Sequence, residues 1–163
     1  MDTGKIMMAE LNGSHVIKFV GDVRLTMCTT IEACLKTMFD KSEFNSVVVD
    51  LSETEGIDST SLGLLAKISR EAQSRTHQVP VMVSNNEDIT RIVQSMGFEH
   101  LVYEITSGLN NDVQIDLEEV AMKPLDEQEA HAKVLEAHKL LMDLNQKNYD
   151  TFKDLVQTIE SGH

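Results

Sequence analysis

Residues 46–65 read SVVVDLSETEGIDSTSLGLL, and this stretch decides the fold. It opens with a β-branched run, residues 46–51, of the kind that forms a buried strand in a parallel sheet. From Ser61 onward apolar residues recur at helical spacing, so a helix follows the strand after a short loop. A buried strand that leads into an amphipathic helix is half of a β-α-β unit, which indicates the α/β class.

The same alternation of short apolar runs and helical spacings extends over residues 1–109. Apolar runs at 6–11 and 15–20 flank Asn12-Gly13-Ser14, which predicts a β-hairpin. Further elements, alternately helix and strand, are predicted at 26–41, 46–51, 61–74, 79–84, 87–96 and 101–105. Because right-handed helical crossovers join the strands after the hairpin, we expect a mixed sheet that starts with the hairpin and continues in parallel, with helices packed on it.

Residues 110–163 differ from the rest in charge. They hold 12 acidic and 5 basic residues, a net charge of −7, whereas residues 1–109 hold 15 acidic and 9 basic residues, a net charge of −6. The polar, turn-forming sequence at 107–112 places the boundary between the two parts near residue 110. We therefore expect two regions, a domain over 1–109 and an acidic linker with a helical extension over 110–163.

The helical extension carries an apolar stripe. Asp126 is predicted to cap its start, and the stripe consists of Ala130, Val134, Ala137, Leu141, Leu144, Phe152, Leu155 and Ile159. Asn148 interrupts this stripe, which fits either one helix or two helices that break near residues 145–148. The stripe must lie against an apolar surface. That surface is on its own domain, on a second copy through residues 126–160, or on another partner.

The composition excludes several classes of function. A net charge of −13 and a pI near 4.7 disfavour nucleic acid and anionic membranes as partners. No run approaches the roughly 18 apolar residues of a membrane span, and no apolar leader follows the N-terminus. We therefore expect a cytoplasmic protein.

The cysteines and the C-terminal histidines predict neither a disulfide nor a metal site. Cys28 and Cys34 fall on different faces of one predicted helix, so we expect two reduced core residues. His131 and His138 are separated by about 10.5 Å along a helix axis, too far for one metal ion. We expect these two histidines on a solvated face, and we expect no metal and no cofactor.

The chemistry lies in the loop between the strand at 46–51 and the helix that follows it. Three consecutive hydroxyl residues, Ser59, Thr60 and Ser61, stand where the helix has four unsatisfied N–H groups. One of the three caps the helix under the simplest interpretation, which leaves the others near the surface. A phosphate on such a hydroxyl lies at the positive end of the helix, while Asp58 adds a like charge beside it.

This strand, the loop Ile57-Asp58-Ser59-Thr60-Ser61-Leu62-Gly63 and the order of elements resemble the STAS domain of bacterial anti-sigma factor antagonists. Gly21-Asp22 and the segment 89–98, ITRIVQSMGF, resemble that family as well. The resemblance covers about residues 5–106. It departs at Ser61, where the family usually has glycine, and the helical extension lies beyond the compact members' end.

The resemblance implies a phosphorylation switch that controls a sigma factor. It places the phosphate on Ser59, with Thr60 and Ser61 as alternatives, and the partner-binding surface on Asp22, Asp58, Ser59, Thr60, Ser61, Leu62 and Gly63. Unphosphorylated protein would bind an anti-sigma factor with serine kinase activity and so release sigma. Phosphorylation would break the complex, and a PPM-type serine phosphatase would restore it.

Two other classes of function stay open at this point. The C-terminal extension suggests a scaffold that recruits a signalling enzyme or a transporter complex through the same surface. Catalysis is the weakest hypothesis, because Ser59 lies in no Gly-x-Ser-x-Gly elbow and the sequence marks no histidine base for it. We therefore predict no catalytic residues.

Overall fold

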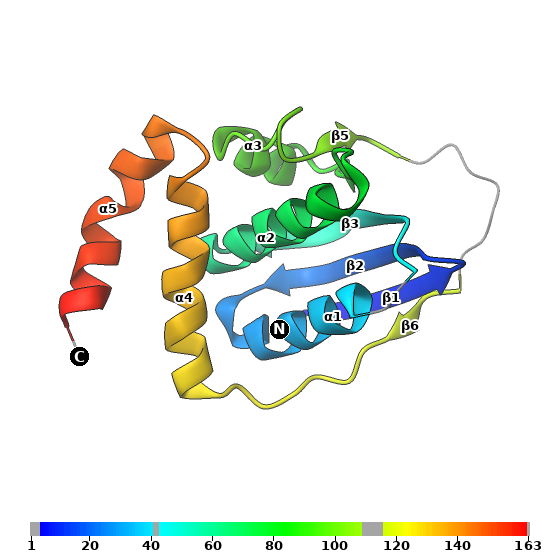
Figure 1. Cartoon of the computed structure of the whole chain (residues 1–163), viewed down its shortest axis with the longest axis horizontal. Coiled ribbons are helices and arrows are strands. Elements are labelled where there is room, and N and C mark those ends of the chain that lie inside the picture. The colour runs from blue at the N-terminus through cyan, green and yellow to red at the C-terminus, as the bar shows by residue number, and fades with distance from the viewer. Residues whose placement is uncertain (1–3, 41–42, 109–115, 163) are drawn as a thin grey trace.

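The computed structural model describes residues 4–40, 43–108 and 116–162, whose strands form a six-stranded sheet (Figure 1). The strands are β1 (Lys5–Leu11), β2 (Ser14–Val23), β3 (Ser46–Ile57), β4 (Val81–Val83), β5 (Glu104–Thr106) and β6 (Glu118–Glu119). Their order is β5-β4-β3-β2-β1-β6. β1 is antiparallel to β2 and β6, whereas β2, β3, β4 and β5 run parallel. The predicted mixed sheet with its initial hairpin is confirmed.

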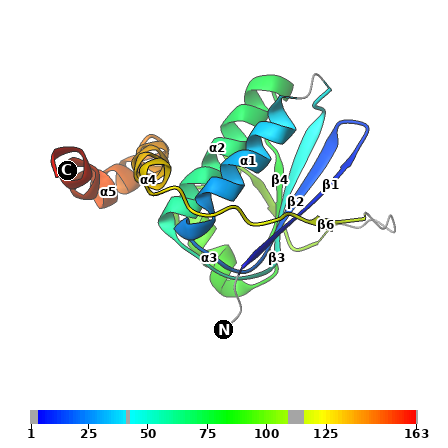
Figure 2. The same cartoon turned by 90° about the horizontal axis from the view of Figure 1, so that it is seen from below.

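The helices pack beside this sheet. They are α1 (Cys28–Phe39), which follows the 3-10 turn η1 (Leu25–Met27), then α2 (Ser59–Thr76), α3 (Glu87–Ser95), α4 (Glu127–Met142) and α5 (Gln146–Ser161). Figure 2 shows α1 and α2 side by side on one face of the sheet, with α4 outside them and α5 farther out. α4 therefore packs mainly on α2 and α5 rather than on the sheet.

The hairpin between β1 and β2 follows from its two turn residues. Asn12 and Gly13 have φ angles of 53° and 85°, both in the left-handed region. Two consecutive left-handed residues form the turn whose twist matches that of the flanking strands, and Asn-Gly is the preferred pair for it. Leu11 and Ser14 are partners at the end of the ladder, as the sequence predicts.

The core lies between the sheet and α1 with α2. Alternate residues of β2 point inward, and Ile17 and Phe19 are completely buried. In β3, Val49 is buried while its neighbours Val48 and Asp50 are only half-buried. The valine run had suggested a strand buried on both faces. It is buried on one face only, because the helices beside it lie on the same side.

Several element boundaries differ from the predicted ones. β3 continues to Ile57, six residues beyond the predicted end, because it stays paired with β2 past Glu53. The last predicted strand starts at Glu104 rather than at Leu101, which is 75% exposed in a turn. β6 had no predicted counterpart. Lys41, the predicted end of the first helix, and the predicted domain boundary near residue 110 lie outside the described residues.

The extension consists of two helices, the second of the two arrangements expected. Asp126 caps α4 by accepting hydrogen bonds from two N–H groups of its first turn. Asn145 caps α5 and accepts from the N–H of Asn148, so the residue that interrupts the stripe lies in the first turn of a new helix. Asn148 also donates from Nδ2 to the carbonyl of Met96, which ties α5 to the end of α3.

Most of the apolar stripe packs on the chain's own domain. Its residues Ala130, Leu141 and Phe152 belong to the same buried cluster as the sheet and α2. Leu155 departs from the predicted stripe and is 43% exposed. Of the three surfaces expected to cover the stripe, the chain's own domain is the one that covers the part of the stripe on α4.

Candidate functional site

The loop that joins β3 to α2 is held by Asp58. This residue has an extended backbone, and its carboxylate accepts hydrogen bonds from the N–H of Ser61 at 2.9 Å and from the N–H of Leu25 at 2.6 Å. The first bond caps α2, and the second fixes the β2–α1 connection beside it. The prediction that a hydroxyl side chain caps this helix was wrong, because the preceding carboxylate takes the role.

The three hydroxyl residues have different environments. Thr60 and Ser61 are 3% and 1% exposed and lie inside the first turn of α2. Ser59 is half-buried and is the first residue of the helix. The hydroxyls not used for capping were expected near the surface, and this was wrong for both buried residues, because α2 turns them inward. Of the three, Ser59 alone reaches the surface.

The Ser59 hydroxyl is hydrogen-bonded to a residue of the C-terminal extension. Its Oγ lies 2.8 Å from Nε2 of His138, which is 79 positions away in the chain. Nδ1 of His138 lies 2.6 Å from the carbonyl oxygen of Val134, one turn earlier in α4. Because a carbonyl oxygen only accepts, Nδ1 carries a proton, and in the neutral form of the ring Nε2 accepts from the serine hydroxyl.

His138 is not on a solvated face, contrary to the prediction. Its side chain is 2% exposed and packs edge-on against Phe152, with 5.1 Å between ring centroids. His131, its counterpart one heptad earlier, is exposed as expected. His138 directly follows the stripe residue Ala137, so the helical pattern places it at the border of the buried face. That border position was the one signal in the sequence for its burial.

A glycine and an alanine allow α4 to approach α2 closely. Gly63 is buried in the second turn of α2, and a Cβ atom built on it would lie 2.4 Å from the carbonyl oxygen of Ala137. The same atom would lie 2.5 Å from the Cβ atom of Ala137, which is itself completely buried. The two helices therefore touch through their backbones, and neither position has room for a larger residue.

An ion cluster borders this helix contact. Nζ of Lys67 on α2 lies 2.7 Å from Oε1 of Glu136 on α4 and 2.9 Å from Oε1 of Glu32 on α1. Lys133 of α4 approaches the same two carboxylates at 3.4 and 3.5 Å. Four charges from three helices thus join the extension to the domain.

The cluster shifts the proton affinities of its members. Burial disfavours the charged form of Lys67, but hydrogen bonds and charge attraction from Glu136 and Glu32 outweigh it and raise the lysine pKa. Burial likewise disfavours the charged form of Glu136, but Lys67 and Lys133 outweigh it and lower the pKa of this carboxyl. Both groups are therefore charged at neutral pH.

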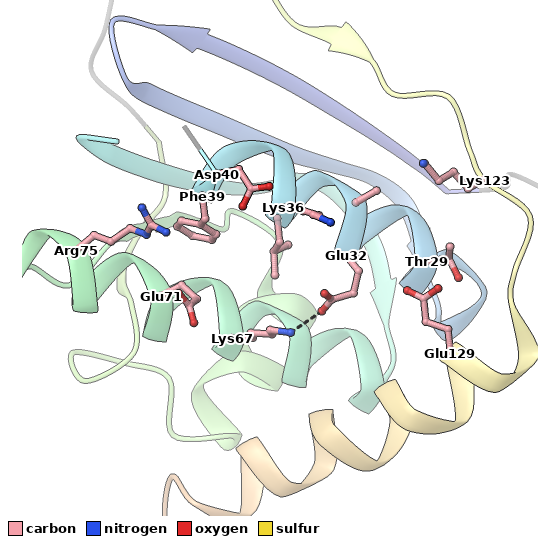
Figure 3. Close-up of a pocket in the computed structure, with 12 residues that line it drawn as sticks. Thr29, Glu32, Lys36, Phe39, Asp40, Lys67, Glu71, Arg75, Lys123 and Glu129 are labelled. Atoms are coloured by element: carbon pink, nitrogen blue, oxygen red, sulfur yellow. Dashed lines mark hydrogen bonds and ion pairs between the residues drawn. The ribbon is translucent and has the colours of Figure 1, made fainter. Parts of the chain in front are cut away.

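A groove of about 490 Å³ continues from this cluster between α1 and α2 (Figure 3). Arg75 lies over the ring of Phe39 in it, 5.3 Å from the ring centroid, in a cation–π contact. Its lining carries charges of both signs, from Glu32, Lys36, Lys67, Glu71, Arg75, Lys123 and Glu129. Ser59 is not part of the lining, so this groove lies beside the serine rather than around it.

The remaining residues of the predicted site separate into two groups. Leu62 is 3% exposed and Gly63 is buried, so neither residue is accessible to solvent. Asp22 lies on β2 opposite Gly56, near the end of β3, and forms a 2.8 Å ion pair with Arg24. The structure thus brings residues 58–63 together at one helix end and places Asp22 at the neighbouring strand end.

Cys28 and Cys34 are both free and buried, as predicted, and burial raises the pKa of Cys34 to about 11. The described residues contain no cluster of side chains suited to hold a metal ion. Within the same parts of the chain, no helix is long and apolar enough to span a bilayer.

Comparisons with known proteins identify the family to which this fold belongs. The family model described as "STAS domain" matches residues 5–118. No match was found among curated protein sequences.

Three similar solved structures are anti-sigma factor antagonists. A Mycobacterium paratuberculosis antagonist has a TM-score of 0.58 at 18% identity and covers 66% of this chain and 89% of its own. The antagonist SpoIIAA in its unphosphorylated form has a TM-score of 0.52 at 13% identity, with 64% and 89% covered. The phosphorylated form of the Bacillus cell fate determinant SpoIIAA has a TM-score of 0.51 at 14% identity, with 63% and 91% covered. These structures share the fold, and the family model covers more than half of the sequence, so the chain belongs to the STAS domain family.

Proposed function

We propose that the protein is an anti-sigma factor antagonist controlled by phosphorylation of Ser59. Unphosphorylated, it binds an anti-sigma factor that is also a serine kinase, and sigma is released. The kinase transfers the γ-phosphoryl group of ATP to the serine Oγ, ADP leaves, and the hydroxyl proton passes to the kinase. A PPM-type phosphatase hydrolyses the ester and restores the binding form.

One observation carries the choice of Ser59. Of the three adjacent hydroxyls, it alone is half-buried rather than buried, and it is the first residue of α2. A phosphate there is stabilised by the positive end of the helix, so the domain can keep its fold. It also adds about −1.5 to −2 charges beside Asp58, which changes the surface that a partner contacts. The hydroxyls of Thr60 and Ser61 can accept a phosphoryl group only if the first turn of α2 unfolds.

The partner-binding surface consists of the start of α2 and the strand end next to it. Asp58 holds this loop through its two backbone hydrogen bonds, which makes it a positioning residue for Ser59. Leu62 and Gly63 are buried in this structure and join the surface only when the segment packed on them moves away, whereas Asp22 forms its charged border.

Paired substitutions at Ser59 test this function. Binding to the sigma-regulating kinase is measured for wild type, Ser59→Ala and Ser59→Asp, with Ser74→Ala and Ser74→Asp as controls at an exposed position of the same helix. We expect Ser59→Ala to bind and Ser59→Asp to lose at least tenfold in affinity, while both Ser74 variants bind like wild type. Equal binding of the two Ser59 variants would contradict the switch.

A scaffold function is the second candidate, and the C-terminal helices favour it. α4 and α5 lie beyond residue 118, where the family match ends. A scaffold would recruit a signalling enzyme or a transporter complex through the same surface without controlling sigma. Affinity purification from cells separates the two, because the scaffold predicts a signalling enzyme and no sigma-regulating kinase.

A homodimer through residues 126–160 stays a prediction. The exposed apolar residues Tyr149 and Leu155 of α5 are the part of that segment available to a second copy. Light scattering of the full chain checks it, since a dimer has twice the 18.2 kDa of one chain.

A further inference from the structure

α4 lies over the part of α2 that the proposed function assigns to the partner. The contact includes Ser59 with His138 and Gly63 with Ala137; Ser59 and Gly63 are one turn apart on α2, whereas Ala137 and His138 are adjacent on α4. Lys67 with Glu136 extends it by a further turn of α2. In this arrangement the covered face of α2 is already occupied, and the occupant is a segment of the same chain (Figure 2).

The serine hydroxyl is also occupied chemically. Its Oγ is hydrogen-bonded to Nε2 of His138, whose ring lies between Ser59 and Phe152. Phosphoryl transfer requires the serine oxygen to approach the phosphorus in line with the leaving group. A kinase active site cannot surround Ser59 while the His138 imidazole lies against its hydroxyl and α4 packs closely on Gly63, one turn further along α2, so α4 must move first.

The contact is of a kind that can be released without unfolding the domain. Its centre combines the small residues Gly63 and Ala137 with one hydrogen bond and a partly exposed ion cluster, each of modest net energy. The extension also buries Leu141 and Phe152 in the apolar cluster that α2 shares with the sheet. Hydrogen bonds also attach the extension to α1 and to the end of α3. Lys123 donates its N–H to Oγ1 of Thr30 on α1, and Asn148 donates to the carbonyl of Met96 at the end of α3.

We propose that α4 and α5 form an intramolecular cover over Ser59 and the first two turns of α2, and that release of this cover admits the kinase and the partner. This inference rests on the proposed function, whose site it regulates. The covered chain is a resting form that neither binds the partner nor is phosphorylated, even when the kinase and the phosphatase are active. A partner must displace a tethered helix. The apparent affinity of the chain for that partner is therefore the intrinsic affinity multiplied by the fraction of molecules that are open.

A substitution within α4 releases the cover without touching the STAS domain. Ala137→Leu puts three extra carbons where the Gly63 backbone leaves no space, and leucine keeps helix propensity. Ala132→Leu is the matched control, because Ala132 is exposed on the same helix. Hydrogen exchange of the full chain is measured for residues 127–142 and 58–66, with β2 and β3 as an internal standard for the folded core.

We expect Ala137→Leu to exchange at least tenfold faster than wild type over residues 127–142, and faster over 58–66, with unchanged β2 and β3 and a control like wild type. Equal exchange in Ala137→Leu and Ala132→Leu would overturn the cover. Should the leucine variant fail to fold, Glu136→Lys repeats the test, because it sets a third positive charge beside Lys67 and Lys133.

Phosphate on Ser59 is then quantified by mass spectrometry in the same proteins expressed in their own cells. A rise of at least threefold in Ala137→Leu over Ala132→Leu supports the cover as the gate. Equal phosphate despite faster exchange would overturn the gate. Faster exchange with no phosphate on Ser59 in any variant would leave the cover standing and contradict the proposed function instead.

Discussion

The sheet core and the contact between α2 and α4 are both buried, yet they are built from different side chains. The core consists of large apolar residues such as Phe19, Leu51 and Leu65, whose side chains are completely buried between the sheet and the helices. The α2–α4 contact is centred on Gly63, Ala137 and polar groups, with Leu141 as its large apolar residue. Because apolar area supplies most of the folding free energy, the first region fixes the fold, whereas the second can open at lower cost than the core.

The largest expected effect concerns Gly63→Ala, which should destabilise the wild-type chain but stabilise a chain whose cover is already released. In the otherwise wild-type chain, Gly63→Ala forces a Cβ atom against Ala137, and we expect a loss of about 1–3 kcal/mol in stability. In the Ala137→Leu background, where α4 is already released, alanine acts only within α2. There it should stabilise the protein by about 1 kcal/mol, because alanine forms helices better than glycine.

Urea denaturation of the four proteins in this cycle measures the effect, with the slope of the free energy against urea checked for each. A loss of similar size in both backgrounds would mean that Gly63 is constrained by the domain itself, and the distinction between core and cover would fail at this position.

A smaller effect is expected from pH. The lowered pKa of Glu136 means that its ion pairs stabilise the covered form fully above its ordinary value of 4.5, and that this contribution is lost as the pH falls through the lowered pKa. The raised pKa of Lys67 acts at the opposite end, since its contribution is present below 10.5 and is lost only above the raised pKa. The cover should therefore loosen in acid while the sheet stays closed.

Protection factors for α4 and β3, which correct for intrinsic exchange, test this between pH 3.5 and 7. We expect α4 to lose protection on the acidic side in the wild type, and Glu136→Gln to show lower protection at pH 7 and a smaller further loss toward acid. A parallel loss in α4 and β3 would assign the acid sensitivity to the whole domain instead.

The sequence predicted those parts of the fold that depend on local patterns. Asn12-Gly13 specifies the hairpin turn by itself, and the spacing of apolar residues in α2 and α4 specifies both helices. β3 was predicted too short because Glu53 and Glu55 break its apolar pattern, although pairing with β2 continues past them. β6 could not be predicted, since the two glutamates that form it are ordered only by the edge of β1.

The candidate site was predictable on one side only. Residues 58–63 were identified from the loop and its resemblance to a family, whereas His138 was assigned to solvent. Its burial depends on how α4 docks on α2, a contact across 79 positions that no local pattern encodes. The close approach of Gly63 and Ala137 is of the same kind, because small residues are compatible with many positions and specify none alone.

The most direct test of the account is the position of the phosphate in protein isolated from its own cells. Fragmentation of the peptide that contains residues 58–63 distinguishes Ser59 from Thr60 and Ser61 by mass spectrometry. The account predicts phosphate on Ser59, because it is the one hydroxyl of the three that reaches the surface. Phosphate on Thr60 or Ser61 with none on Ser59, or no phosphate on any of the three under any growth condition, would contradict it.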